Sequence, residues 1–192
     1  MDKSLYLFVG KSASGKTTIA DILEQKCGMR QVYSYTTRPP RYEGEIGHIF
    51  VSNEDFNYLG KLAAYTLYNG FKYGTTFKQL EECDVYVIDV PGVETLLERW
   101  EDNDRQIRIL YFDAAVSTRI DRMVDRGSSD MEIIKRLHND DTTENWYNQL
   151  DKLVWHYKNN EHMDIQLHKI NANENIENVL EQVLSYINNE TE

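Results

Sequence analysis

The sequence is short of cysteine and of positive charge, and both shortages narrow the classes of protein it can belong to. Its 192 residues include two cysteines, Cys27 and Cys83, whose separation fits neither a disulfide framework nor a metal-ligand spacing. We therefore expect free thiols in a reducing compartment. Lysine and arginine number 21 against 32 acidic residues, a net charge of −11. This balance argues against a nucleic-acid-binding surface, but a small site can still gather basic residues around an anion.

Long apolar runs are also missing. No segment approaches the roughly 20 apolar residues that a membrane-spanning helix needs. The N-terminus leads directly into a predicted strand, without an apolar signal segment. We therefore expect a cytoplasmic protein with no membrane or nucleic-acid partner, either a monomer or a homodimer. A chain of 192 residues is most simply a single domain with a substantial core.

Residues 10–17 are the most informative motif that is present. They read GKSASGKT, which matches the phosphate-binding loop pattern of glycine, four residues and Gly-Lys-Thr. An apolar strand at 5–9 precedes the loop and a helix at 15–27 follows it, which is the order the motif requires. Glycines let backbone N–H groups surround phosphate oxygens, a lysine reaches the β- and γ-phosphates, and a threonine hydroxyl ligates Mg²⁺. The candidate nucleotide-binding residues are Gly10, Ser12, Ser14, Gly15, Lys16, Thr17 and Thr18.

Strand and helix patterns alternate along the rest of the chain, which predicts a parallel α/β sheet flanked by helices. The predicted strands are 5–9, 31–35, 49–52, 85–89, 107–112 and 164–167. The predicted helices are 15–27, 55–59, 76–82, 91–100, 116–124, 131–158 and 176–187. Ligands bind such sheets at the carboxyl ends of the strands, so the phosphate loop, residues 34–36 and Asp89 should converge there.

An Asn-Gly pair at 69–70 separates two runs rich in aromatic residues, which is a strong β-hairpin signal. Short antiparallel strands here would form a small lobe beside the parallel sheet. The aromatic side chains of this lobe either wall a ligand or are ordinary strand residues. They are Tyr65, Tyr68, Phe71 and Tyr73.

Clustered arginines stand out in an acidic chain. Arg38 and Arg41 lie on a loop stiffened by two prolines, where two guanidinium groups suit a phosphate monoester. A second set lies at Arg119, Arg122, Arg126 and Arg136. The first three share a helical face, and inward-pointing arginines would stabilise a phosphoryl group in transfer. The alternative is a solvated face paired with Asp121 and Asp125, which we favour for Arg119.

Asp89 ends a buried apolar strand, where an unpaired carboxylate is costly. Coordination of Mg²⁺, directly or through water, would provide a partner for it. The alternative is that Asp89 caps the helix predicted to begin near Pro91.

These residues together resemble the guanylate kinase family of nucleoside monophosphate kinases over nearly the whole chain. Residues 34–41 read SYTTRPPR and precede Gly44-Glu45 and Gly47, which is similar to the acceptor-binding signature of the family. Residues 73–75 read YGT, and Arg122, Arg126 and residues 135–137 resemble the lid.

The resemblance implies a role for each matching residue. Ser34 would contact the base and Thr75 the base or its near side, while Arg38, Arg41 and Tyr73 would hold the acceptor phosphate. Asp89 would position Mg²⁺. The phosphoryl group in transfer would be stabilised by Lys16, Arg122, Arg126 and Arg136. The cofactors would be ATP and Mg²⁺. The chain would divide into a core at 1–35 and 84–188, an acceptor lobe near 36–83 and a lid near 122–136.

The departures from the family pattern fall on base recognition. The family has a glutamate where this chain has Ala64, and His48 stands near the position of a family tyrosine. Either Glu43 or Glu45 could supply the acid that follows the arginines, and Val90-Pro91-Gly92 replaces a segment that usually holds a second acid. Losing a hydrogen-bond acceptor should relax or change the choice of base.

The expected reaction is therefore transfer of the γ-phosphoryl group of ATP to a nucleoside monophosphate, most simply GMP or dGMP. One alternative is a kinase similar to the ribose 1,5-bisphosphate phosphokinases, which act on a sugar phosphate. The other is a binding module without catalysis, which would typically lack the intact phosphate loop seen here.

Overall fold

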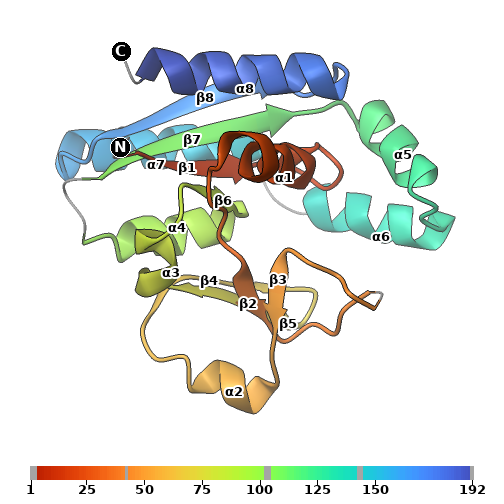
Figure 1. Cartoon of the computed structure of the whole chain (residues 1–192), viewed down its shortest axis with the longest axis horizontal. Helices are drawn as coiled ribbons and strands as arrows, with labels where there is room; N and C mark the ends of the chain where they lie inside the picture. Colours follow the sequence, from red (N-terminus) through yellow and green to blue (C-terminus); the bar gives the residue numbers. More distant parts are fainter. Residues whose placement is uncertain (1–3, 42, 102–104, 142–144, 191–192) are drawn as a thin grey trace.

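The computed structural model describes residues 4–41, 43–101, 105–141 and 145–190, which form two sheets and the helices around them (Figure 1). The larger sheet has the order β6-β1-β7-β8 and is parallel throughout. Its strands are β1 (Ser4–Val9), β6 (Val85–Val87), β7 (Gln106–Asp113) and β8 (Ile165–Asn171). Every residue of β1 is buried, as expected for a strand covered on both faces. The predicted parallel α/β architecture is confirmed.

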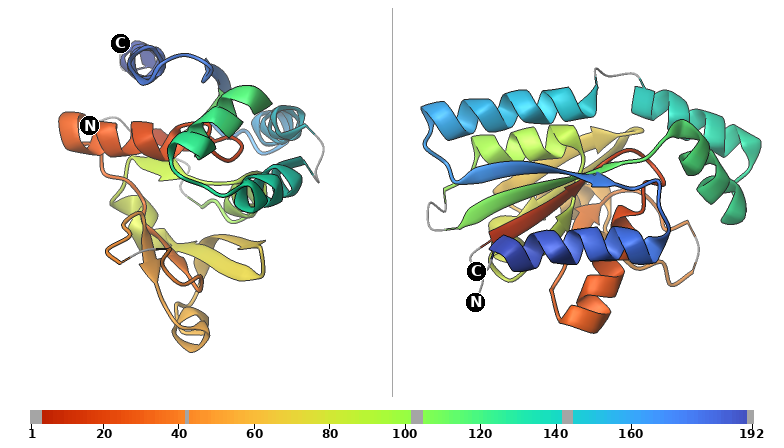
Figure 2. Two further views of the ribbon diagram at one scale, coloured as in Figure 1. Left: turned by 90° about the vertical axis from the view of Figure 1, so that its right-hand side faces the viewer. Right: turned by 90° about the horizontal axis from the view of Figure 1, so that it is seen from above.

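Helices cover both faces of this sheet (Figure 2). On one face, α4 (Val90–Glu98) and α7 (Trp146–Asn160) pack against Leu5, Leu7 and Val9. On the other, α1 (Lys16–Cys27) and α8 (Ile176–Glu190) pack against Tyr6 and Phe8. Successive side chains of a strand point to opposite faces, so one short segment supplies both cores.

The second sheet has the order β3-β2-β5-β4 and forms a separate lobe below the first in Figure 1. Its strands are β2 (Ser34–Thr36), β3 (His48–Phe50), β4 (Leu62–Tyr68) and β5 (Phe71–Thr76), and its helices are α2 (Asn53–Asn57) and α3 (Phe77–Glu81). The predicted hairpin is present, with Asn69 and Gly70 at φ of +53° and +80°. Ser34 and Tyr35 pair with this sheet, although the sequence placed them on the core side of the division near residue 36.

An arm of two helices, α5 (Val116–Asp125) and α6 (Asp130–Asp141), follows β7. The prediction of one continuous helix over 131–158 is wrong, because α6 and α7 are separate helices. A new helix begins at Trp146, where the Asn145 side chain accepts a hydrogen bond from the backbone N–H of Tyr147. Asparagine is a favoured residue at this capping position.

Among the residues that the structure describes, no helix has the length and apolar composition needed to cross a membrane.

Candidate active site

The phosphate loop lies between β1 and α1, and two of its glycines are required by geometry. Gly10 has φ of +155°, and a Cβ there would lie 2.6 Å from the carbonyl oxygen of Phe112. Gly15 has φ of +99° and directly precedes α1. Side chains are strained at both positions, so the loop can close around its own backbone only with glycine.

Lys16 folds back over this loop. Its Nζ donates hydrogen bonds to the carbonyl oxygens of Gly10 at 2.6 Å and Lys11 at 3.0 Å, and to Ser14 Oγ at 3.1 Å. Burial lowers the pKa of Lys16 to about 8, while the carboxylates of Asp140 and Asp89 act in the opposite direction. The ammonium group is therefore held at the loop but incompletely compensated, which suits it to receive an anion.

The other loop residues have distinct environments. Ser14 is buried beneath the loop, whereas the Thr17 side chain is exposed in the first turn of α1. Thr18 lines a second cavity together with Gly15, Arg122 and Arg126. Ser12 donates from its backbone N–H to Asp140 Oδ2 at 2.9 Å and from its hydroxyl to Oδ1 at 3.1 Å.

The arginine loop is organised by Glu45. Its carboxylate accepts two hydrogen bonds from the Arg38 guanidinium, at 2.8 and 3.1 Å, and one from the backbone N–H of Arg41 at 2.6 Å. Hydrogen bonding to Arg38 and Arg41 lowers the pKa of Glu45. Glu43 is exposed, so Glu45 is the acid that holds the two arginines. Arg38 also lies over the Phe50 ring at 5.2 Å.

Three neutral side chains stand beside this loop. Ser34 Oγ and His48 Nδ1 are 3.0 Å apart, and the His48 ring meets the Tyr73 ring edge-on with centroids 5.5 Å apart. Burial and the nearby Arg38 and Arg41 lower the pKa of His48 to about 4. His48 is therefore a neutral imidazole at pH 7 and offers a hydrogen-bonding group without charge.

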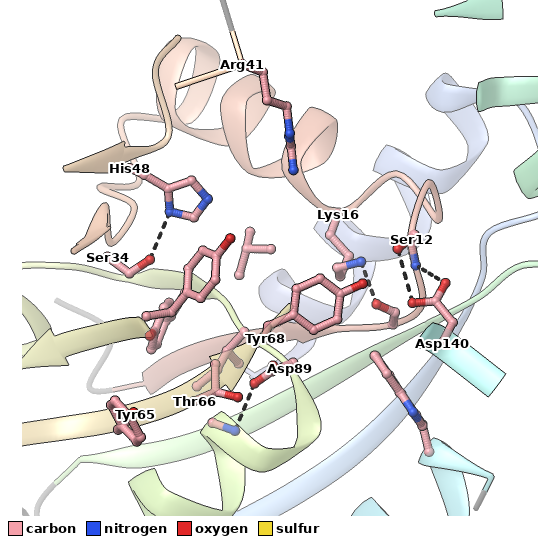
Figure 3. A pocket seen from close by; sticks show the side chains of 17 residues that line it. Ser12, Lys16, Ser34, Arg41, His48, Tyr65, Thr66, Tyr68, Asp89 and Asp140 are labelled. Atoms are coloured by element: carbon pink, nitrogen blue, oxygen red, sulfur yellow. Dashed lines mark hydrogen bonds between the residues drawn. The ribbon is translucent and has the colours of Figure 1, made fainter. Parts of the chain in front are cut away.

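One cavity collects residues from both sheets (Figure 3). Of the residues to which the sequence assigned a binding role, it brings together Gly10, Ser12, Lys16, Ser34, Arg41, His48, Tyr73 and Asp89. The first three come from the phosphate loop and Ser34, Arg41, His48 and Tyr73 come from the lobe. The lobe therefore presents Arg41 and Tyr73 to the same space that Lys16 faces.

Thr75 does not line this cavity. Its side chain is fully buried and its hydroxyl donates a hydrogen bond to the Tyr86 hydroxyl at 2.8 Å. Tyr86, which the sequence did not single out, lines the cavity instead. Thr75 thus orients a residue of the cavity wall from behind. Ala64 is also buried, with 1% of its surface exposed, and belongs to the core.

Asp89 caps α4, because its Oδ1 accepts a hydrogen bond from the backbone N–H of Gly92 at 2.9 Å. It also lines the cavity with Lys16, and burial raises its pKa against the opposing effects of Gly92, Thr66 and Lys16. The structure therefore confirms the interpretation that Asp89 caps this helix. Capping does not exclude a second role, since a carboxylate can accept several interactions.

The residues present also fit Mg²⁺. Thr17 offers an exposed hydroxyl and Asp89 a carboxylate facing the cavity, and hard oxygen ligands of this kind suit Mg²⁺ when phosphates and water complete its shell. Within the described residues, no group of three or more His, Cys, Asp or Glu side chains could hold a metal ion unaided.

The arginines of the arm separate into different environments. Arg122 donates to the carbonyl oxygens of Ala13 at 3.4 Å and Glu174 at 3.0 Å, which places it against the phosphate loop. Arg126 is exposed and lines the second cavity. Burial lowers the pKa of Arg41, and the positive charges of Arg38 and of Arg136, on α6, act in the same direction.

Arg119 is a buried structural residue, but its partner differs from the expected one. Its Nη1 lies 2.8 Å from Asp140 Oδ2, and the two side chains are 1% and 2% exposed. The expectation of pairing with Asp121 or Asp125 is therefore wrong, because Arg119 turns toward α6 instead of along its own helix. Nothing in the sequence indicated that Asp140 is this partner, because it is one of several polar residues at the end of a helix.

Tyr65 and Tyr68 line the cavity together with Thr66. Their aromatic clustering was visible in the sequence, which left open whether they wall a ligand or are ordinary strand residues. Phe71 is not among the residues lining this cavity.

Residues 7–146 match a family model described as an AAA domain. A curated guanylate kinase from Geobacter metallireducens is 34% identical over 110 residues, covering 50% of this chain and 54% of that protein. One from Nitrosomonas europaea is 30% identical over 146 residues, covering 69% of this chain and 70% of that protein. The first match thus spans about half the length of the relative.

A solved guanylate kinase from Anaplasma phagocytophilum has a similar fold, with a TM-score of 0.54 at 18% identity, covering 97% of this chain and 86% of that one. The fold is thus that of a P-loop protein, with a parallel sheet and a nucleotide-binding loop. Within that class, the chain belongs to the guanylate kinase family.

Proposed function

We propose that the protein transfers the γ-phosphoryl group of ATP to the phosphate of a nucleoside monophosphate, GMP or dGMP first among them. The observation that carries this proposal is the shared cavity, in which Lys16 of the phosphate loop faces Arg41 and Tyr73 of the lobe. Two anionic phosphates repel each other, so an enzyme that joins them needs positive groups on both sides of the transferred group. This cavity supplies them from two separate elements.

On the donor side, the triphosphate would lie in the loop 10–17, with its oxygens on backbone N–H groups and on Lys16. The second cavity, lined by Gly15, Thr18, Arg122, Arg126 and Asn173, would receive the rest of ATP. Thr17 and Asp89 would hold Mg²⁺, which supplies positive charge to the phosphate oxygens when bound.

On the acceptor side, Glu45 pre-orients Arg38 and the backbone of Arg41, so the loop is stiff before substrate arrives. Arg41 and Tyr73 would bind the acceptor phosphate, with Arg38 behind them. Arg122, Arg126 and Arg136 would stabilise the group in transfer as the arm closes over it. We propose that residues 122–136 act as this lid, that residues near 36–83 are the acceptor lobe, and that residues 1–35 and 84–188 form the core.

The opposite end of the acceptor would meet Ser34, neutral His48 and Tyr86. Position 64 is an alanine buried in the core, so it offers no carboxylate to a base. This observation favours one second candidate, a sugar phosphate such as ribose 1,5-bisphosphate, which presents no base. A non-catalytic binding module is the weaker alternative, because Lys16 and the loop glycines are intact.

The test is formation of ADP from ATP and Mg²⁺ with GMP, dGMP, AMP, CMP, UMP, dTMP or ribose 1,5-bisphosphate as acceptor. We expect turnover with GMP or dGMP. Turnover of the sugar bisphosphate alone would assign the protein to the second candidate. Binding of ATP without turnover of any acceptor would contradict both and support a binding module.

A further inference from the structure

The C-terminal end of α6 contacts two elements at once. Asn139 Nδ2 donates a hydrogen bond to Asn69 Oδ1 at 2.8 Å, in the turn of the β4–β5 hairpin. The next residue, Asp140, accepts hydrogen bonds from the backbone N–H and the hydroxyl of Ser12 in the phosphate loop. Two consecutive residues of one helix therefore join the lobe to the loop, and Figure 2 shows α6 beside the hairpin.

Asp140 is held firmly in this position. Its Oδ2 lies 2.8 Å from Arg119 Nη1, and both side chains are almost completely buried. A buried ion pair of this kind favours one arrangement of its elements, because either charge alone would be left without compensation. The end of α6 is thus fixed against the phosphate loop by Ser12 on one side and by Arg119 on the other.

Tyr68, the last residue of β4, completes the contact. Burial raises the pKa of the Tyr68 hydroxyl, and the neighbouring side chains of Ser12 and Asn139 act in the opposite direction. Tyr68, Ser12 and Asp140 line the same cavity, and Figure 3 shows the Tyr68 ring pointing toward the Ser12–Asp140 contact. The hairpin tip, the loop and the helix end therefore meet at one point, which we call the junction (Ser12, Tyr68, Asn69, Asn139 and Asp140).

The region of β4 nearer its start is anchored elsewhere. Arg99 Nη1, at the end of α4, donates to the carbonyl oxygen of Leu62 at 2.9 Å, and Thr95 Oγ1 donates to that of Tyr65 at 3.1 Å. The strand is thus attached to α4 near its start and to α6 at the hairpin. A strand held at two points cannot rotate freely about either one, so the lobe keeps a defined orientation.

We propose that Asn139 and Asp140 are positioning residues that set the distance and angle between the acceptor groups of the lobe and the phosphate loop. The inference rests on the proposed phosphoryl transfer. Arg41 and Tyr73 belong to the lobe, whereas Lys16 belongs to the core. An error of about 1 Å between reacting groups can cost 100-fold in rate. Losing the junction should therefore slow the transfer step more than it weakens the binding of either substrate.

Two variants break the same hydrogen bond from opposite sides. Asn139→Ala removes the donor and also its contact with Tyr68. Asn69→Gly removes the acceptor while keeping the turn, since Asn69 has φ of +53°, which glycine adopts readily. His138→Ala, at an exposed position on the same helix, is the matched control.

We expect each variant to lower kcat about 10-fold, with the KM for ATP within about twofold of wild type. The double variant should be no slower than Asn139→Ala alone, because the shared bond can be lost only once. His138→Ala should match wild type. Multiplied losses in the double variant, or an unchanged kcat in both single variants, would overturn the proposal.

Hydrogen exchange at the amides of residues 68–71 gives a readout that needs no catalysis. Asn139→Ala should raise the rate of exchange there by about 10-fold, because the hairpin tip loses its hydrogen bond to α6. If the wild type phosphorylates no acceptor while the exchange rises as expected, the proposed function fails and the junction stands as a contact between lobe and loop. Unchanged exchange at the hairpin overturns the junction itself, whatever the activity.

Discussion

Lys16 and Arg38 are both basic residues of the site, but removing each side chain should change the kinetics in a different way. Lys16→Ala should abolish transfer, because it removes the charge that meets the phosphoryl group. Arg38→Ala should raise the KM for the acceptor at least about 10-fold and leave the KM for ATP nearly unchanged, since it loses a bidentate partner of Glu45 and loosens the arginine loop. Steady-state kinetics with each substrate varied in turn measures both effects.

Lys26→Ala, in the last turn of α1, and Arg30→Ala, exposed outside the site, are controls for the loss of one positive charge. Both should retain wild-type kinetics. Full activity in Lys16→Ala is the result that would overturn the mechanism.

The lowered pKa of Lys16 predicts proton uptake on nucleotide binding. In the free protein Lys16 has a pKa of about 8, below its ordinary value because of burial. A bound phosphate favours the charged form and raises that pKa, so near pH 8.5 the complex should take up a fraction of a proton, while at pH 6.5 it should take up none. Calorimetry of ATP binding in two buffers of different ionisation enthalpy measures the uptake. Identical apparent enthalpies at pH 8.5 would argue against this role for Lys16.

At the scale of elements, the Arg119–Asp140 pair joins α5 to α6 and should carry much of the stability of the arm. Arg119→Met leaves Asp140 buried without its charge partner, at a cost of about 3–5 kcal/mol in the free energy of unfolding. The double variant Arg119→Met/Asp140→Leu should recover only part of that loss, since two apolar side chains can replace the ion pair but the Ser12 N–H and hydroxyl lose their acceptor. Urea denaturation measures both values.

Asp151→Asn, on the exposed surface of α7, is the control for removal of one negative charge and should change stability by less than about 0.5 kcal/mol. A loss of under 1 kcal/mol in Arg119→Met would show that water reaches the pair and compensates Asp140.

Elements were predictable where their signals are local. The hairpin at 69–70 follows from two residues that accept positive φ, and β1 follows from an unbroken apolar run. The division between α6 and α7 was missed, because asparagine occurs both inside helices and at their caps, and only the hydrogen bond from the backbone N–H of Tyr147 identifies Asn145 as a cap. Local patterns locate elements well and their ends less well.

At the scale of the whole molecule, the charge of −11 should make stability depend on salt. Like charges repel in the folded state, and raising ionic strength from about 0.01 M to 0.15 M shortens the screening length from about 30 Å to about 8 Å. We expect the unfolding midpoint to rise by about 2–4 °C, which corresponds to about 1 kcal/mol for a domain of this size. Thermal denaturation in NaCl measures it, with sucrose as an uncharged control. A falling midpoint would indicate that attractive pairs outweigh the net charge.

The sequence by itself determined the parts whose chemistry is contiguous: the phosphate loop, the arginine loop and the strand–helix alternation that gives the parallel sheet. Each depends on backbone geometry or residue spacing within a few positions. The tertiary structure decided which residues share the cavity, that Thr75 supports Tyr86, and that Asp140 meets both Ser12 and Arg119. Ser12 and Asp140 are 128 positions apart, so their contact arises only when the sheet brings loop and arm together. No local pattern encodes a partner at that separation, because the energy of the contact depends on burial that the fold as a whole creates.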